Sequence, residues 1–463
     1  MDFLGREKEL AVLEREYGRS SSFVVVYGRR RVGKTTLIKE FIKGKNALYF
    51  LAGEEDDRQN LNRFTEKAAL FAQQPYIAGS RLDSWDNAFR IFAHSSEEKK
   101  ILVIDEFQYL AQMNPAFPSI FQRVWDEILE GSNTMVILCG SLINMMTSQV
   151  LSHSSPLYGR RTAQIRLQPL SFDEFRGAFP DRPFEELTKL YSITGGVPKY
   201  IDFFTGSESL WENIRDNILA KSGFLYEEPV FLLEREVREP VNYFSLMRAI
   251  SLGNHRISKI AGVLEQKTSF VSPYLSTLTD LSLVEKRLPV TEGSPEKSRK
   301  GLYFISDHFI DFWFKFVYPY RSELEMDNVD YVMDKIRSAL VENHVSFIFE
   351  EISRSTLISL CKSRRIDLVP SRVGSYWDSN TEIDVAAVDN ENNRVFAGEC
   401  KFYERPVPAD VFFELQKKTR NVKEFQGREL IYGIFSVSGF EPRLVELAQS
   451  SPALHLINNG ELI

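Results

Sequence analysis

Cysteine is scarce in this chain of 463 residues, and long apolar runs are missing. Its three cysteines, Cys139, Cys361 and Cys400, are far apart and odd in number. This pattern excludes a disulfide framework and the paired spacing of a zinc site. No stretch approaches the ~20 apolar residues that cross a bilayer, and the N-terminus lacks the basic and apolar segments of a signal peptide. We therefore expect a cytoplasmic protein with no membrane partner.

An excess of positive charge is also missing. The chain has 57 Lys and Arg against 64 Asp and Glu, a net charge of −7. This balance argues against a globally basic nucleic-acid binder, so any DNA contact must come from a local patch. The length suggests about three domains of 100–200 residues each.

One motif near the start carries the most information. Residues 28–35 read GRRRVGKT and match GxxxxGK[ST] at every fixed position, between an apolar run at 23–27 and a helical pattern. A strand, a glycine-rich turn and a helix form a phosphate cradle, in which Lys34 reaches the β- and γ-phosphates and Thr35 offers its hydroxyl to Mg²⁺. We therefore predict ATP and Mg²⁺ as cofactors. The residues expected to bind the nucleotide here are Gly28, Arg31, Val32, Gly33, Lys34, Thr35 and Thr36.

Further polar residues follow the next apolar strands. The run at 101–104 ends in Asp105 and Glu106. Asp105 is predicted to hold Mg²⁺, and Glu106 to orient and deprotonate the attacking water. The alternative is a core strand that ends in two solvated acids. Ser141, after the run at 135–139, is a candidate sensor of the γ-phosphate or a small turn residue.

Two adjacent arginines are candidates for transition-state stabilisation. Arg160 and Arg161 follow a flexible stretch at 152–156. An arginine placed here can reach a γ-phosphate in cis or in a neighbouring subunit, and Arg160 is our candidate catalytic residue. The alternative is an ordinary surface arginine.

Together, these motifs resemble a known group of enzymes. Gly5-Arg6-Glu7, the glycine-rich loop, Asp105-Glu106 and Gly196-Val197-Pro198 are similar to AAA+-related ATPases. The similarity is closer to the prokaryotic archaeal-type ATPases related to STAND signalling NTPases, and it covers about residues 2–320. It implies that Gly5 and Arg6 lie near the adenine and that Pro198 packs on the base. A nucleotide-dependent homo-oligomer is also possible on this interpretation.

The order of the patterns predicts an α/β protein with several domains. Apolar strands at 23–27, 47–51, 101–105, 135–139 and 163–167 alternate with helical patterns, which is typical of a parallel sheet. The predicted domains are a P-loop ATPase core at 1–165, a helical lid at 166–238, a winged helix at 239–305, a connector at 306–335 and a nuclease-like domain at 336–463. The aromatic residues of the connector are expected to form core rather than a base-stacking platform.

The predicted winged helix has a local excess of positive charge. Helical patterns at 244–250, 257–261 and 269–278, the last with Pro273 in its first turn, precede a hairpin. Residues 241–305 hold nine Lys and Arg against five Asp and Glu. The basic hairpin tip at 297–300 suits contacts with DNA phosphates. The alternative is a lid extension that only packs on the ATPase core.

The C-terminal part carries a second chemistry. Strand patterns at 381–388 and 394–402 flank a turn, which predicts a hairpin with Glu399 and Lys401 on one face and Asp384 opposite Glu399. Two carboxylates and a lysine suit hydrolysis with Mg²⁺, and the helical Glu350 is a further acid for the metal. The alternative is a solvated hairpin with alternating charges.

This second pattern resembles the PD-(D/E)XK nuclease superfamily over about residues 340–440, although Ile383 replaces the usual neighbour of the aspartate and the leading proline is absent. The resemblance implies a restriction-endonuclease-like α/β domain that cleaves DNA. The main alternative is a STAND-like ATP-dependent switch or scaffold whose nuclease-like domain is inactive. A helicase-type motor is a weaker alternative, because no helicase motifs follow Asp105-Glu106.

Overall fold

The computed structural model describes residues 3–79, 82–206, 208–237, 239–294, 296, 298 and 300–463. The chain forms two compact units. The first unit contains Met1–Ala178 and Gly196–Thr205, and the second contains Phe179–Gly195 and Gly206–Ile463. The predicted lid is therefore divided between the units. Lys297 and Arg299 of the predicted basic tip lie outside the described residues.

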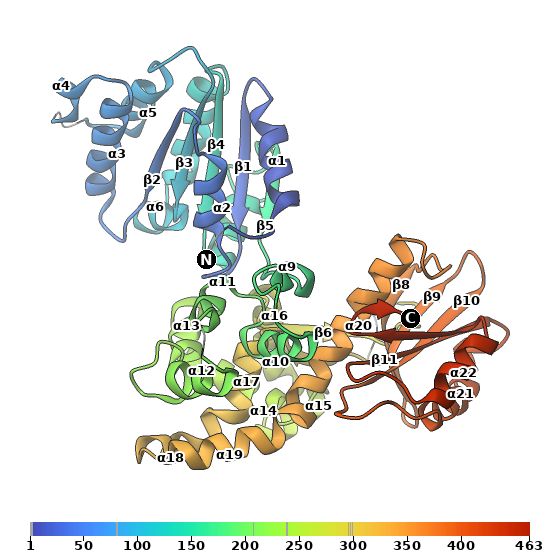
Figure 1. The fold of residues 1–463 in the computed structure, drawn as a ribbon. Coiled ribbons are helices and arrows are strands. Elements are labelled where there is room, and N and C mark those ends of the chain that lie inside the picture. The colour runs from blue at the N-terminus through green and yellow to red at the C-terminus, as the bar shows by residue number, and fades with distance from the viewer. Residues whose placement is uncertain are drawn as a thin grey trace. The chain divides into compact units, whose positions relative to one another are not determined.

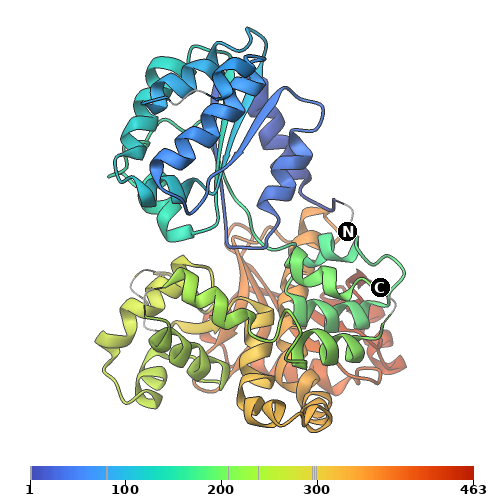
Figure 2. The same ribbon diagram turned by 90° about the vertical axis from the view of Figure 1, so that its left-hand side faces the viewer.

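The first unit is built around a parallel sheet. Its strands are β1 (Ser22–Tyr27), β2 (Ala47–Leu51), β3 (Lys100–Asp105), β4 (Thr134–Gly140) and β5 (Ala163–Arg166). Every predicted strand of this region forms within one residue of its expected bounds. Strands β1, β3 and β4 are buried along their whole length, which explains their continuous apolar sequences. Figure 2 shows helices on both faces of this sheet.

The strand order is β2-β3-β4-β1-β5, and all neighbours are parallel. The carboxyl ends of β1, β3 and β4 therefore lie at one edge, where α/β proteins bind ligands. The helices of this unit are α1 (Glu7–Tyr17), α2 (Lys34–Phe41), α3 (Asp57–Phe71), α4 (Pro75–Ala78), α5 (Trp85–Ala93), α6 (Phe107–Met113), α7 (Phe117–Val124), α8 (Ile143–Met146), α9 (Phe172–Arg176) and α11 (Pro198–Ile201).

The second unit begins with helices and a hairpin (Figure 1). The helices are α10 (Phe184–Thr194), α12 (Leu210–Asn213), α13 (Glu228–Glu236), α14 (Pro240–Ser251), α15 (Ile257–Val263), α16 (Thr268–Asp280), α17 (His308–Phe316), α18 (Arg321–Glu325) and α19 (Val329–Leu340). Strands β6 (Val284–Arg287) and β7 (Leu302–Ile305) pair antiparallel between α16 and α17. The helices and hairpin expected at 239–305 thus form in the predicted order.

The position of Pro273 differs from the prediction. Helix α16 begins at Thr268, so Pro273 lies inside the helix and not in its first turn. A proline there cannot donate to the carbonyl four residues earlier, that of Ser269. The sequence did not reveal this because Thr268 and its neighbours carry no side-chain cap that marks the start.

The aromatic residues of the connector form core. Phe312, Trp313, Phe314 and Phe316 of α17 are buried. The Trp313 indole donates to the carbonyl of Tyr226 at 2.7 Å. Since these rings pack inside the second unit, they are not available for stacking on bases.

The C-terminal part contains a mixed sheet. Its elements are the helix α20 (Ser346–Lys362), strands β8 (Arg372–Trp377), β9 (Glu382–Asp389) and β10 (Arg394–Lys401), helix α21 (Asp410–Arg420), strand β11 (Glu429–Ser436), helix α22 (Pro442–Ser450), and strands β12 (Leu454–Asn458) and β13 (Glu461–Leu462). The order is β13-β12-β11-β10-β9-β8. Strands β8, β9 and β10 are antiparallel neighbours, whereas β10, β11 and β12 are parallel and are connected through α21 and α22. The predicted hairpin is β9–β10.

Among the described residues, no helix has the length and apolar character that a bilayer crossing requires.

Candidate ATP site and a second carboxylate site

The predicted phosphate cradle lies between β1 and α2. A Cβ on Gly28 would collide with the carbonyl oxygen of Leu167, and the φ of Gly28 is +153°. No other residue fits this position without a shift of the backbone. The ammonium of Lys34 donates to the carbonyls of Gly28 and Arg29, both at 2.8 Å. The loop therefore curls around Lys34 at the N-terminus of α2, which is the arrangement that binds phosphate.

Asp105 lies beside the loop, as predicted. Its Oδ2 accepts a hydrogen bond from the Thr35 hydroxyl at 2.9 Å and another from the hydroxyl of Tyr49. A hydroxyl and a carboxylate side by side are oxygen ligands that suit Mg²⁺ together with phosphate oxygens and water. Burial and the neighbouring Asp105 raise the pKa of Tyr49. Tyr49 was missed in the sequence because an aromatic residue in a buried strand carries no signal of a site.

Glu106 has a left-handed backbone conformation, with a φ of +56°. Few residues other than glycine adopt it, and it is frequent at functional sites. Its Oε2 accepts hydrogen bonds from the Ser141 hydroxyl at 2.8 Å and from the Gln108 amide. Ser141 is therefore adjacent to the candidate base. Gln108 was missed, although its place two residues after Glu106 is a usable signal.

The Gly-Arg-Glu segment and the Gly-x-Pro segment both contact the loop. The buried guanidinium of Arg6 donates to the carbonyl of Val32 at 3.1 Å and to that of Gln168 at 2.6 Å. Pro198 Cγ lies 3.6 Å from the position of a Cβ on Gly33. Both segments thus border the loop, and their contacts with the adenine remain predictions.

A left-handed glycine fixes the Gly-x-Pro segment. The φ of Gly196 is +68°, and a Cβ there would collide with the carbonyl oxygen of Leu170. The Leu170 amide donates to the Gly196 carbonyl at 2.8 Å. The Tyr200 hydroxyl in the following helix accepts from Arg29 at 3.4 Å.

Arg160 does not point freely into solvent. Its guanidinium donates to both carboxylate oxygens of Asp126, at 2.7 and 2.8 Å, and to the carbonyl of Pro156. The Arg161 guanidinium lies 5.6 Å from the centre of the Tyr158 ring. A role for Arg160 at a γ-phosphate requires release from Asp126 and stays a prediction.

The second group of predicted residues lies where β9 begins and β10 ends. The pairing runs from Arg394–Asp389 to Gly398–Val385, so Asp384 and Glu399 come next on the two strands. Oδ2 of Asp384 accepts from the Cys400 amide at 2.8 Å. The Lys401 ammonium donates to Glu399 Oε1 at 2.9 Å.

A second lysine completes this group. Lys418 on α21 donates to both carboxylate oxygens of Glu399, at 3.1 and 2.9 Å. No local sequence pattern predicts this contact, because it depends on how α21 packs against β10.

Burial and crowding change the acidity of two carboxylates. Burial, with the charge of Glu399, raises the pKa of Asp384 to about 6. Burial, with the charge of Asp384, raises the pKa of Glu350 to about 8. Glu350 therefore tends to hold a proton at neutral pH, whereas Asp384 stays mostly ionised there.

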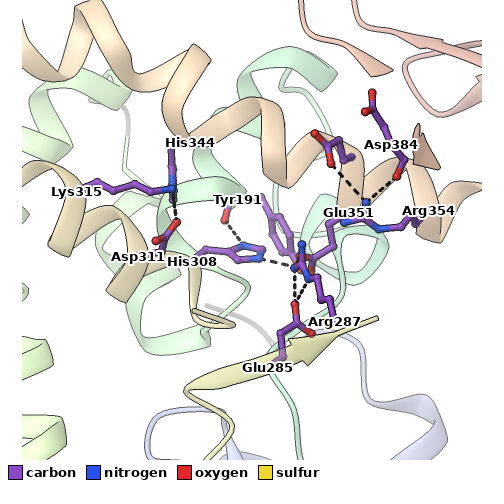
Figure 3. Close-up of polar contacts among 11 residues, drawn as sticks. Tyr191, Glu285, Arg287, His308, Asp311, Lys315, His344, Glu351, Arg354 and Asp384 are labelled. Carbon is purple, nitrogen blue, oxygen red and sulfur yellow. Dashed lines mark hydrogen bonds and ion pairs between the residues drawn. The ribbon is translucent and has the colours of Figure 1, made fainter. Parts of the chain in front are cut away.

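Glu350 does not take the predicted place as a third metal ligand. Among the residues that the structure describes, no group of three His, Cys, Asp or Glu side chains is arranged to hold a metal ion. Glu350 instead lies 3.6 Å from the guanidinium of Arg354, which donates to the Asp384 carbonyl at 2.9 Å. Figure 3 shows the guanidinium of Arg354 directed at the backbone carbonyl of Asp384.

Asp384 and Glu399 offer two carboxylates to a divalent cation, although a cation on Glu399 would have to share its oxygens with Lys401 and Lys418. Mg²⁺ is commonly held by one or two carboxylates, with water completing its shell. A cation between the two acids would relieve the repulsion that raises the pKa of Asp384.

Comparison with known proteins places the chain. Residues 3–204 match the model of an ATPase domain found predominantly in Archaea. The uncharacterized protein MJECL04 of Methanocaldococcus jannaschii is 33% identical over 401 residues, which are 86% of this chain and 87% of that protein. The chain belongs to this family of archaeal-type ATPases. In this archaeal-type ATPase, residues 313–420 match a second model, that of archaeal and bacterial proteins of unknown function.

A solved structure supports the fold of the archaeal-type ATPase. The Walker-type ATPase PABY2304 of Pyrococcus abyssi has a TM-score of 0.50 at 19% identity, over 68% of this chain and 96% of that one. The ORC2 protein of Aeropyrum pernix, solved as ADPNP–ADP complexes, has a TM-score of 0.44 at 14% identity, over 72% and 95% of the two chains. The first likeness supports the P-loop α/β fold.

Proposed function

We propose that this ATPase couples its nucleotide state to DNA binding and to Mg²⁺-dependent DNA cleavage by the C-terminal domain. The ATPase part follows from the family and the phosphate cradle. The observation that carries the cleavage part is the convergence of Asp384, Glu399 and Lys401 at one end of the β9–β10 hairpin.

In ATP hydrolysis, the chain's own residues hold and orient the reactants. The loop amides and Lys34 bind the phosphates, and Thr35 and Asp105 would hold Mg²⁺, which neutralises charge on the phosphates. Glu106 accepts a proton from the attacking water. Ser141 and Gln108 both donate to Oε2 of Glu106 and so orient this carboxylate, and its other oxygen, Oε1, is the one that would accept from the water.

In DNA cleavage, the lysines and carboxylates divide the work. Asp384 and Glu399 would hold Mg²⁺, which stabilises charge on the scissile phosphate. Lys401 positions the attacking water or deprotonates it, and Lys418 orients the Glu399 carboxylate. Asp384 lies on β9, Glu399 and Lys401 lie on β10, and Lys418 lies on α21, so regular elements hold all four groups in place.

DNA binding is assigned to the predicted winged helix and the C-terminal domain. The local excess of positive charge at 241–305, together with α16 and the β6–β7 hairpin, supports this assignment. Phosphate contacts of this kind position a duplex without reading its sequence.

The test is cleavage of labelled single- and double-stranded DNA with Mg²⁺, with and without ATP. Asp384→Ala and Lys401→Ala should abolish cleavage and leave ATP hydrolysis unchanged, because they lie in the other unit from the P-loop. Lys417→Ala, an exposed neighbour on α21, is the matched control and should cleave like the wild type. Cleavage that survives in Asp384→Ala would rule out this site.

A second candidate is a STAND-like switch with an inactive nuclease-like domain. It is favoured by the two lysines that already occupy both oxygens of Glu399. This candidate predicts slow ATP turnover, an oligomer size that depends on nucleotide, and no cleavage by the wild type.

A further inference from the structure

A cavity in the second unit lies between the predicted winged helix and the C-terminal sheet. Its volume is about 490 Å³, and its lining includes Arg256, Lys300, Trp377, Asn380, Asn421 and Lys423. Arg256 immediately precedes α15, Trp377 ends β8, and Lys423 begins a short helix after α21. The cavity thus gathers cationic, amide and aromatic groups from segments far apart in the sequence.

Several polar side chains of this cavity are not engaged with the rest of the described protein. In the described part of the chain, the side chains of Arg256 and Lys423 have no hydrogen-bond or ion-pair partner, and neither do the side-chain amides of Asn380 and Asn421. Lys300, by contrast, lies 3.9 Å from the carboxylate of Glu292. The half-buried Trp377 stacks on no other ring there, and its indole N–H donates to no protein group. Groups left unpaired around one hollow are available to a ligand.

The two acids in the cavity lining are already used. Asp378 accepts from the amides of Asn380 and Thr381, at 2.7 and 2.8 Å, and from the Tyr376 hydroxyl at 3.0 Å. Glu424 accepts from the same hydroxyl at 3.4 Å. The groups that remain for a ligand are cations, amide groups and an indole. This set favours an anionic ligand with flat rings.

The cavity is close to the candidate cleavage site. Trp377 pairs with Glu382 at the start of β9. Asp384 follows Glu382 by two residues, which is about 7 Å along a strand. An extended ligand bound in the cavity would therefore be able to continue to the carboxylates of Asp384 and Glu399.

We propose that this cavity binds a single strand of DNA, with one unpaired base stacked on Trp377 and phosphates held by Arg256 and Lys423. The inference rests on the proposed function and names how the substrate enters its site. Stacking on an aromatic side chain beside a cationic groove is how single strands are bound without sequence preference. A base paired inside a duplex cannot reach the indole.

The test uses the full chain with Asp384→Asn, which removes cleavage, and a fluorescein-labelled oligothymidine of 20 nucleotides. Fluorescence anisotropy gives the affinity at several salt concentrations. The double variant Arg256→Glu/Lys423→Glu should bind at least tenfold more weakly. Its salt dependence should have a slope reduced by about 1.4, for two lost phosphate contacts.

Trp377→Leu should weaken binding at least fivefold, whereas Trp377→Phe should retain most of it, because a ring still stacks. The affinity for a blunt duplex should fall less than threefold in the same variants. The matched control is Lys362→Glu/Lys417→Glu, which changes the charge equally at exposed positions outside the cavity lining.

Two outcomes would overturn the inference. One is unchanged affinity in the double variant or in Trp377→Leu, and the other is a loss that the control variant shares. Binding is measured without cleavage, so these outcomes leave the proposed function to its own assay. Conversely, loss of affinity in both variants with no cleavage by the wild type would retain the strand site and reject the nuclease.

Discussion

Glu106, the candidate base of the ATPase, has an uncommon backbone conformation, and its neighbours hold its side chain in place. Glu106 combines a left-handed backbone with a carboxylate bound by Ser141 and Gln108. This left-handed conformation costs of order 1–3 kcal/mol of free energy, and it persists because β3 before Glu106 and α6 after it hold the residue in place. The conformation aims the side chain at the edge of the sheet where β1 and β4 also end.

The first prediction concerns this residue. Glu106→Gln should lower the rate of ATP hydrolysis at least 100-fold, because an amide cannot accept the proton of the attacking water. Nucleotide binding should stay within threefold, since the loop and Lys34 are untouched. Phosphate release and titration with a fluorescent ATP analogue measure the two effects.

The control for this experiment is Glu66→Gln, an exposed acid on α3. It should hydrolyse ATP like the wild type. If Glu106→Gln retains more than a tenth of the wild-type rate, another group acts as the base.

Residues of both sites differ in how far the sequence predicted them. Thr35 and Asp105 follow from a motif and from the end of a buried strand, and the structure brings them to 2.9 Å. The contact of Lys418 depends on which helix covers β10, and that of Tyr49 on which strand pairs with β3, and no local spacing encodes either. Glu350 does lie near Asp384, as its pKa shows, but it also lies 3.6 Å from Arg354 on the same helix, and no group of three metal-ligating side chains forms among the described residues.

At the scale of elements, helix α20 places two adjacent acids, Glu350 and Glu351, in different surroundings. Glu350 faces the carboxylates of the C-terminal sheet, and burial with Asp384 raises its pKa to about 8. Glu351 lies near His308 at 3.5 Å and Arg287 at 3.3 Å. Burial alone would raise its pKa, but His308 and Arg287 reverse this and lower it to about 2. Figure 3 shows this contact between α20, α17 and β6.

The second prediction follows from this helix. Glu351 has a lower pKa in the folded chain than its ordinary value of about 4.3, so its contribution to stability is present above pH 4.3 and is lost as the pH falls toward 2. Glu351→Gln should reduce the free energy of unfolding by about 1 kcal/mol at pH 6, a modest value because the carboxylate is partly exposed. The difference should narrow at pH 3.5.

Urea unfolding at the two pH values measures this effect. Glu342→Gln, an exposed acid just before α20, serves as the control and should show no such dependence. An equal loss of stability at both pH values would contradict the ion-pair explanation.

The elements themselves were largely predictable. Buried apolar runs gave the strands of the first unit, and turn residues gave the β9–β10 hairpin. The start of α16 was wrong because it has no capping side chain. The grouping of 196–205 with the first unit was not predicted, since it depends on the contacts of Gly196 and Pro198 with distant segments.

At the scale of the molecule, the third prediction tests ATP binding. A ligand that binds only the folded state adds about 2.7 kcal/mol at a concentration of 100 Kd. ATP with Mg²⁺ should therefore raise the Tm of the full chain by about 5 °C or more. Lys34→Ala should remove this shift, because its ammonium neutralises the phosphates, and Lys43→Ala, exposed after α2, should retain it.

Differential scanning fluorimetry measures these shifts. The same Tm rise in Lys34→Ala and in the wild type would mean that ATP binds elsewhere.

The path of the chain between the two units has a mechanical consequence. The chain crosses from one unit to the other at 178–179, at 195–196 and at 205–206. Residues 196–205, which include Pro198 beside the phosphate loop, are therefore joined covalently to the second unit at both of their ends. A movement of Pro198 would therefore be transmitted to the second unit at two covalent crossings, 195–196 and 205–206.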